Sequence, residues 1–91
     1  MKQTSYTSYD FRPVTVVPVI ASFDSDGRIS PLYVRIQGEP LKIQSFRIRN
    51  AGRFNTTEFH CMIISQDKLI PLAITFHQFE NIWTIPGYPG G

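Results

Sequence analysis

The residue types that bind transition metals are few in this chain, which has one cysteine and two histidines. His60 and Cys61 are adjacent, so in an extended strand their side chains point to opposite faces of the sheet. The strand pairing derived below also separates His60 from His77 by about four residues, or about 13 Å. We therefore expect no metal site within one chain.

Catalytic chemistry is not predicted either. A nucleophilic Cys61 would need an accessible, electropositive surrounding and a base within reach. Its expected neighbours are instead apolar, namely Phe59, Ile63 and Leu72. No glycine-flanked nucleophile turn is present, and no glycine-rich phosphate loop precedes a helix. We expect a non-enzymatic protein without a cofactor, a metal or a small-molecule substrate.

The acidic run at residues 24–27 begins like a calcium-binding loop, with the sequence Asp-Ser-Asp-Gly. An EF-hand needs glycine at its sixth position and glutamate at its twelfth, which here is Arg35. The same run suits a type I turn followed by a left-handed glycine. The sequence therefore predicts a hairpin connection at this point.

Basic residues provide the first candidate binding surface. In the expected pairing Arg35 lies across from Lys42, and both side chains point outward. Like charges opposed across strands are mildly destabilising, which favours either a solvated face or an anionic partner. A neighbouring tyrosine can stack on a nucleic-acid base. We predict nucleic-acid binding through an outward basic face made of Tyr33, Arg35, Lys42, Arg47, Arg49 and Arg53, with a merely solvated face as the alternative.

Apolar residues provide a second candidate surface. Residues 57–64 and 69–76 carry apolar side chains on both faces, and a sheet of this kind is usually covered on both faces. The cover is the chain's own tail, a second copy of the chain or another protein. The alternative function is therefore a protein–protein or homo-oligomeric interface made of Met62, Ile64, Leu69 and Ala73.

The last two residues, Gly90 and Gly91, resemble the terminal diglycine of ubiquitin-like and sulfur-carrier proteins. The resemblance implies activation at the C-terminal carboxylate. Those proteins pack a helix across their sheet, and the span that would form it here is interrupted by Gly38 and Pro40. A carrier function is a minor alternative to a flexible tail.

Six strands are expected to position these residues, because runs of apolar residues alternate with turn-forming residues. No segment combines the 3.6-residue period with helix caps, so little or no helix is expected. The expected strands are residues 17–23, 29–36, 41–48, 57–64, 69–76 and 82–85.

Pairing these strands in sequence order requires two bulges. A bulge near Ser30 and Pro31 keeps apolar residues on one face of the first hairpin and places Leu32 inward. After a two-residue turn at residues 38–39, a second bulge at residues 44–45 keeps the apolar residues Phe46 and Ile48 inward. Two bulges in consecutive strands favour a curled sheet.

The later strands pair without a bulge, after a loop at residues 50–55. Phe59, Cys61 and Ile63 then lie beside Ile74, Leu72 and Ile70, and Trp83 and Ile85 point inward. Strands of this size and order most economically form a small barrel.

The predicted fold is an all-β, six-stranded antiparallel meander that resembles SH3-like or OB-like barrels, with a two-layer sandwich as the alternative. This resemblance rests on size and strand order and implies nothing about function. A chain of 91 residues suffices for one domain. We predict a flexible lead over residues 1–13, one barrel domain over 14–86 and a flexible tail over 87–91.

Charge and composition restrict the partners only weakly. The net charge is +2, too small to indicate nucleic acid without local clustering. The single cysteine excludes an internal disulfide framework and fits a reducing compartment, so a cytoplasmic location is expected. Because no apolar run approaches the length of a membrane span, we expect no membrane partner.

Overall fold

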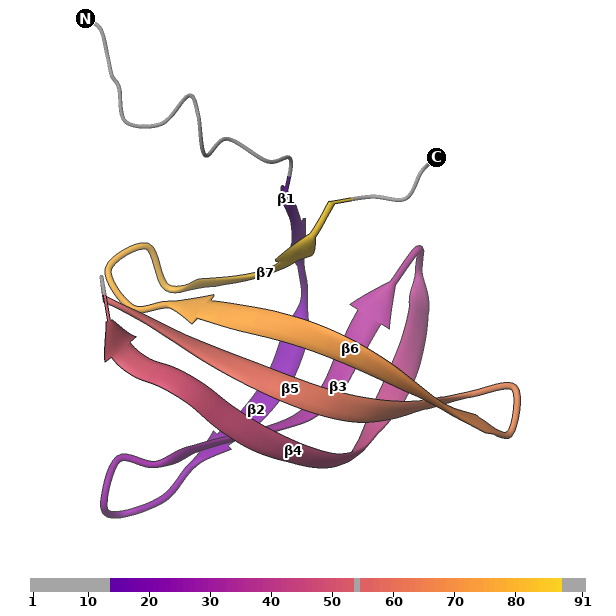
Figure 1. Cartoon of the computed structure of the whole chain (residues 1–91), viewed down its shortest axis with the longest axis horizontal. Helices are drawn as coiled ribbons and strands as arrows, with labels where there is room; N and C mark the ends of the chain where they lie inside the picture. The colour runs from indigo at the N-terminus through magenta and orange to yellow at the C-terminus, as the bar shows by residue number, and fades with distance from the viewer. Residues whose placement is uncertain (1–13, 54, 88–91) are drawn as a thin grey trace, which may run out of the picture.

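A computed structural model of the chain describes residues 14–53 and 55–87. These residues form antiparallel strands in one curled sheet and contain no helix, so this part of the chain has no helix that could cross a membrane (Figure 1). The predicted all-β, barrel-like class is confirmed. The flexible lead and all but the first residue of the predicted flexible tail, including Gly90 and Gly91, lie outside the described residues.

In the described residues, seven strands pair in the order β1-β7-β6-β5-β4-β3-β2. All but one of these pairs join strands that are consecutive in sequence. The strands are β1 (Val14–Val17), β2 (Val19–Phe23), β3 (Ile29–Ile36), β4 (Glu39–Arg53), β5 (Thr56–Ser65), β6 (Lys68–His77) and β7 (Ile82–Pro86).

The expected number of six strands was wrong by one because Pro18 divides the first strand. Proline cannot donate to a ladder, so strand pairing is interrupted there. Before it, β1 pairs with β7, and after it, β2 pairs with β3. The Pro18 carbonyl accepts a hydrogen bond of 3.0 Å from the Arg35 N–H. One bent stretch of chain therefore closes one side of the half-barrel.

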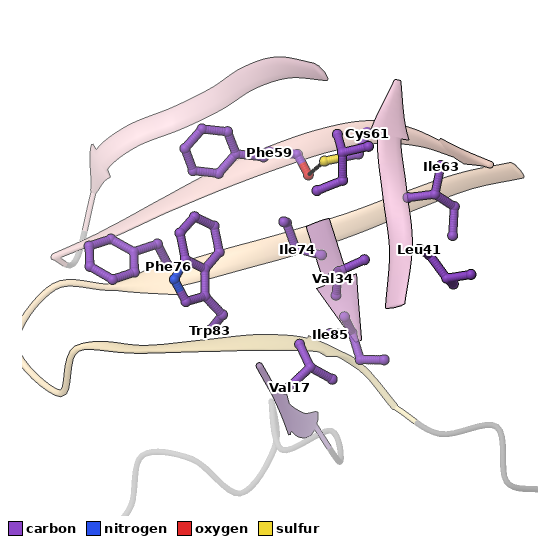
Figure 2. Close-up of a cluster of buried hydrophobic side chains, with 11 residues drawn as sticks. Val17, Val34, Leu41, Phe59, Cys61, Ile63, Ile74, Phe76, Trp83 and Ile85 are labelled. Atoms are coloured by element: carbon purple, nitrogen blue, oxygen red, sulfur yellow. Dashed lines mark hydrogen bonds between the residues drawn. The ribbon is translucent and has the colours of Figure 1, made fainter. Parts of the chain in front are cut away.

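The hydrophobic core fills the inside of the curl. Phe59, Ile74 and Val34 have no exposed surface, and the Trp83 ring lies 5.5 Å from the Phe59 ring and 4.9 Å from the Phe76 ring. We call the sheet face that carries these residues the inner face and the opposite one the outer face. Figure 2 shows the core side chains, which are Val17, Val34, Leu41, Ile43, Phe59, Cys61, Ile63, Ile74, Phe76, Trp83 and Ile85.

The first hairpin turns as predicted. The Asp24 carboxylate accepts hydrogen bonds from the N–H groups of Asp26 at 2.9 Å and Arg28 at 2.8 Å. Gly27 has φ 81°, the left-handed conformation that glycine adopts without strain. The Asp24 carboxylate thus stabilises the connection between β2 and β3.

The bulge in β3 lies one residue later than expected. Ala21 pairs with Pro31 and Ile20 pairs with Tyr33, so Leu32 is the extra residue. Because the ladder then places Pro31 inward, Pro31 is buried and Leu32 is exposed. The prediction that Leu32 points inward was wrong.

The turn between β3 and β4 also lies one residue from its expected position. Gln37 and Gly38 occupy its centre, both with positive φ, as a type I′ hairpin turn requires. The register moves by two residues, so Tyr33, and not Arg35, lies opposite Lys42. Arg35 pairs with Pro40. The expected opposition of Arg35 and Lys42 was therefore wrong, although the outward face of each residue is unchanged.

The second expected bulge is present and bends β4 sharply. Residues up to Lys42 pair with β3, whereas the ladder with β5 begins at Lys42 and skips Gln44. Figure 1 shows β4 leaving the side of β3, turning and continuing beside β5. The strand also runs on to Arg53, so the loop expected at residues 50–55 was wrong in its extent.

Strands β5 and β6 pair in the expected register. Phe59 pairs with Ile74, Cys61 with Leu72 and Ile63 with Ile70. Trp83 and Ile85 are buried on the inner face, as predicted. This part of the sheet is regular because turns at both hairpins supply the required positive φ values, at Gln66, Asp67 and Asn81.

Candidate functional site

The outer face carries a groove where β4, β5 and β6 lie side by side. Its volume is about 470 Å³, and we call it the β4 groove. The bulge at Gln44 restores the alternation of β4, so that its arginines face outward while Phe46 and Ile48 face inward. The groove is lined on the outer face by Arg47 and Arg49 of β4, His60 and Met62 of β5, and Pro71 and Ala73 of β6.

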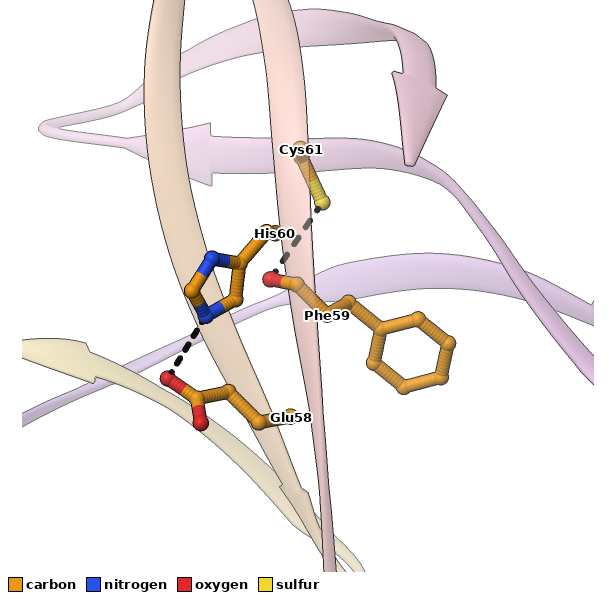
Figure 3. A network of polar contacts seen from close by, with 4 residues as sticks. All are labelled: Glu58, Phe59, His60 and Cys61. Atoms are coloured by element: carbon orange, nitrogen blue, oxygen red, sulfur yellow. Dashed lines mark hydrogen bonds and ion pairs between the residues drawn. The ribbon is translucent and has the colours of Figure 1, made fainter. Parts of the chain in front are cut away.

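Cross-strand pairing fixes the polar side of the β4 groove. Arg47 lies opposite His60, and Arg49 lies opposite Glu58. His60 Nε2 is 3.0 Å from Glu58 Oε2, a hydrogen bond that becomes an ion pair when the imidazole is protonated (Figure 3). Two guanidinium groups and an imidazole therefore lie along one side of the groove, with one carboxylate at its end.

The predicted basic face does not form one cluster. Tyr33 and Lys42 are neighbours on β3 and β4, and both are exposed. On β5 the partners of Lys42 and Arg47 are Ile64 and His60, which are four residues apart, or about 13 Å. The cations therefore form a stripe along β4.

The remaining two predicted residues lie at the ends of this stripe. Arg35 is exposed opposite Pro40, close to the turn that begins β4. The backbone of Arg53 pairs with Thr56 at the far end of β4, and its side chain lies outside the described part of the structure. Arg35 does not line the β4 groove.

The predicted apolar surface meets the basic stripe inside the groove. Met62 and Ala73 are half-buried in its floor, beside Pro71. Ile64 and Leu69 pair with each other further along β5 and β6, where Leu69 is 56% exposed. The two surfaces that the sequence treats as separate are thus continuous.

Sequence reasoning missed the contribution of His60 to this site. The expected pairing of Phe59 with Ile74 and of Cys61 with Leu72 implies that His60 lies opposite Ala73, as observed, but the sequence suggested His60 only as a metal ligand. The expected strands and the bulge at residues 44–45 determine only that Arg47 and His60 share the outer face. Which residue lies opposite Arg47 depends on the register between β4 and β5, and this register shifts again between Arg49 and Arg53.

Cys61 lies on the inner face, opposite in direction to His60 (Figure 3). Its thiol donates a hydrogen bond of 3.8 Å to the Phe59 carbonyl oxygen. Burial raises the pKa of the Cys61 thiol from 9.0 to about 11, because the charged thiolate is poorly solvated there. The thiol is therefore neutral at physiological pH and unsuited to nucleophilic attack.

A metal site is not formed by the residues that the structure describes, since no three His, Cys, Asp or Glu side chains gather to hold an ion. His77 Nε2 instead lies 2.9 Å from Thr84 Oγ1, on a neighbouring strand. In comparisons with known proteins, no family model, no curated protein and no solved structure matches the chain.

The raised pKa of Cys61 predicts how stability depends on alkaline pH. In the unfolded chain the thiol ionises near pH 9, whereas in the folded chain it stays protonated up to about pH 11. The free energy of unfolding should therefore fall across this interval, by roughly 2–3 kcal/mol from this residue. Urea unfolding of the native chain and of Cys61→Ala at pH values across the interval measures the effect. Cys61→Ala should lose less stability, and equal losses in both proteins would contradict the assignment.

Proposed function

We propose that this chain is a non-enzymatic, cytoplasmic binding module that takes single-stranded nucleic acid along the outer face of β4. The observation that carries the proposal is the composition of the β4 groove, which combines Arg47, Arg49 and His60 with an apolar floor. The cytoplasmic location is supported only by the single, unpaired Cys61.

The two kinds of surface in the groove suit the two parts of a nucleotide. Arginine side chains contact phosphate oxygens and supply most of the affinity. The apolar floor of Met62, Pro71 and Ala73 can take the face of an unstacked base. Tyr33, about 13 Å along the stripe and next to Lys42, offers a second stacking surface. A single strand fits this arrangement better than a duplex, whose bases are stacked and paired.

Binding of a fluorescent oligothymidylate, followed by anisotropy, tests the proposal. If about three phosphates are neutralised, affinity should fall roughly 20-fold between about 50 and 200 mM salt. Arg47→Glu combined with Arg49→Glu should abolish binding. The matched control is Arg28→Glu with Lys68→Glu, which changes net charge equally at exposed turn and strand-end positions outside the groove and should bind nearly as well. The proposal is refuted if both double variants lose the same affinity for the oligothymidylate, or if the native chain binds duplex more tightly than single strand.

A second candidate function, self-association through the outer face, is supported by one further observation. Cross-strand pairing places Ile20, Tyr33, Lys42, Ile64 and Leu69 in a row across five strands. Ile20 is 62% exposed and Leu69 is 56% exposed. The row is about 19 Å wide and mostly apolar, so a second copy that packed on it would remove exposed hydrophobic surface from water.

Analytical ultracentrifugation tests this second candidate. The native chain should sediment as a dimer at high concentration, and Leu69→Asp should make it a monomer because a carboxylate would be buried in the interface. Phe79→Asp is the matched control, since Phe79 is 80% exposed in the turn before β7. A native chain that stays monomeric at every concentration would exclude this function.

A further inference from the structure

The second half of β4 has one partner strand where the sheet offers room for two. On one side, residues 45–49 pair with β5. On the other side, the ladder with β3 includes only Glu39, Pro40, Leu41 and Lys42, and the described residues contain no further partner. The facing part of β3, residues 29–32, is likewise unpaired toward β4. The half-barrel is therefore open between these two strands.

The side chains along this open edge of β4 are exposed on both faces. All six residues from 44 to 49 are exposed, although Phe46 and Ile48 point toward the inner face. Phe46 is 36% exposed while its ring packs against Phe59 at 5.6 Å, and Ile48 is 48% exposed. Such residues are normally covered when a sheet is closed. The open edge thus lacks both a hydrogen-bonding neighbour and a cover for its apolar face.

An edge of this kind is suited to adding a strand from another chain. Backbone N–H and C=O groups supply the affinity in strand addition, and alternate side chains supply the specificity. Here the alternation is distinctive, because Phe46 and Ile48 face inward while Arg47 and Arg49 face outward. A complementary strand would carry apolar residues at every second position and acidic residues between them.

A second copy of β4 does not meet this requirement. The antiparallel register that pairs the whole of residues 45–49 with its own copy places Arg47 directly opposite Arg47. Like charges directly opposed across strands are destabilising, whereas opposite charges are stabilising. Charge complementarity therefore favours an acidic partner strand over self-pairing.

We propose that the open edge of β4 at residues 45–49 is a docking site for an extended segment of a partner protein, in which apolar and acidic residues alternate. The added strand pairs with β4, packs its apolar side chains on Phe46 and Ile48, and sets its carboxylates beside Arg47 and Arg49. Five residues of β4 span about 16 Å, so a segment of about seven residues suffices. The proposal does not depend on the proposed nucleic-acid binding: both would use Arg47 and Arg49 on the outer face, but only strand addition uses the backbone edge and the inner-face residues Phe46 and Ile48.

The test uses the full chain and an end-capped peptide of about seven residues that alternates valine and glutamate, with binding measured by calorimetry. Methylation of those peptide nitrogens that face β4 removes hydrogen-bond donors and should weaken binding roughly tenfold or more. Ile48→Thr keeps a β-branched residue and should weaken binding several-fold. Circular dichroism checks that each variant is folded.

A charge exchange makes the test specific. Arg47→Glu should weaken binding of the acidic peptide roughly tenfold and strengthen binding of the matching valine–lysine peptide. Lys68→Glu, at the hairpin between β5 and β6, should leave the affinity for both peptides unchanged. The proposal is overturned if the acidic peptide shows no saturable binding. This outcome includes the case in which the chain's own residues 1–13 occupy the edge. Equal binding of the methylated peptide, or a dimer that forms through this edge, would overturn it as well.

The oligonucleotide assay separates this proposal from the proposed function. Ile48→Thr should leave oligothymidylate affinity unchanged, because Ile48 faces inward and the β4 groove lies on the outer face. If oligothymidylate binds and the acidic peptide does not, the docking proposal fails and the proposed function stands. If Ile48→Thr lowers the affinity for oligothymidylate and for the acidic peptide equally, the edge is not a separate site and the docking proposal is overturned.

Discussion

The bend of β4 at Gln44 is the constraint on which the rest of the structure depends. One extra residue in the ladder lets a single strand belong to two pairings, with β3 before the bend and with β5 after it. Leu41 and Ile43 therefore enter the core from one direction, and Phe46 reaches Phe59 from another. A straight β4 would remain beside β3 along its length, and the sheet would not curl around the aromatic core.

The same bend creates both candidate surfaces. It turns Arg47 and Arg49 outward against His60 and Glu58, which forms the polar side of the β4 groove. It also draws β4 away from β3, so that the inner face of Phe46 and Ile48 remains exposed. On the opposite side the half-barrel is closed by the kink at Pro18, where the chain pairs first with β7 and then with β3. Within the described residues, the opening therefore lies between β3 and β4.

The positions of most strands, and the side chains that point inward, were predictable from the sequence. Along most of the chain, alternating apolar residues and the turn residues between them indicate the same strand boundaries. The β5–β6 register was predictable in full, since no bulge interrupts it. The predicted registers were wrong where the sequence allows more than one position for a turn or a bulge. Gly38 fits either central position of a two-residue turn, and the β3 bulge can lie at Leu32 or at a neighbouring residue. Because side chains alternate with period two, the two-residue register error preserved every face but misplaced Arg35 relative to Lys42.

The candidate site was less predictable than the fold. Arg47, Arg49, Met62 and Ala73 were identified one by one, but their assembly into a groove depends on the β4–β5 register, which shifts between Ile43 and Ser45 and again between Arg49 and Arg53. The exposure of Phe46 and Ile48 was not predictable from pattern, because alternation shows which face a residue occupies and not whether that face is covered.

Amide hydrogen exchange of the free protein, resolved by residue with NMR, tests most directly whether β4 parts from β3 at Gln44. An edge strand has every second amide bonded to its one neighbour and the others open to water. Every second amide of residues 45–49 should therefore exchange rapidly, while all amides of residues 59–63 in β5, which has partners on both sides, should be protected. Protection of every amide across residues 45–49 would contradict the open edge, since it would mean that β4 has a second partner along that side.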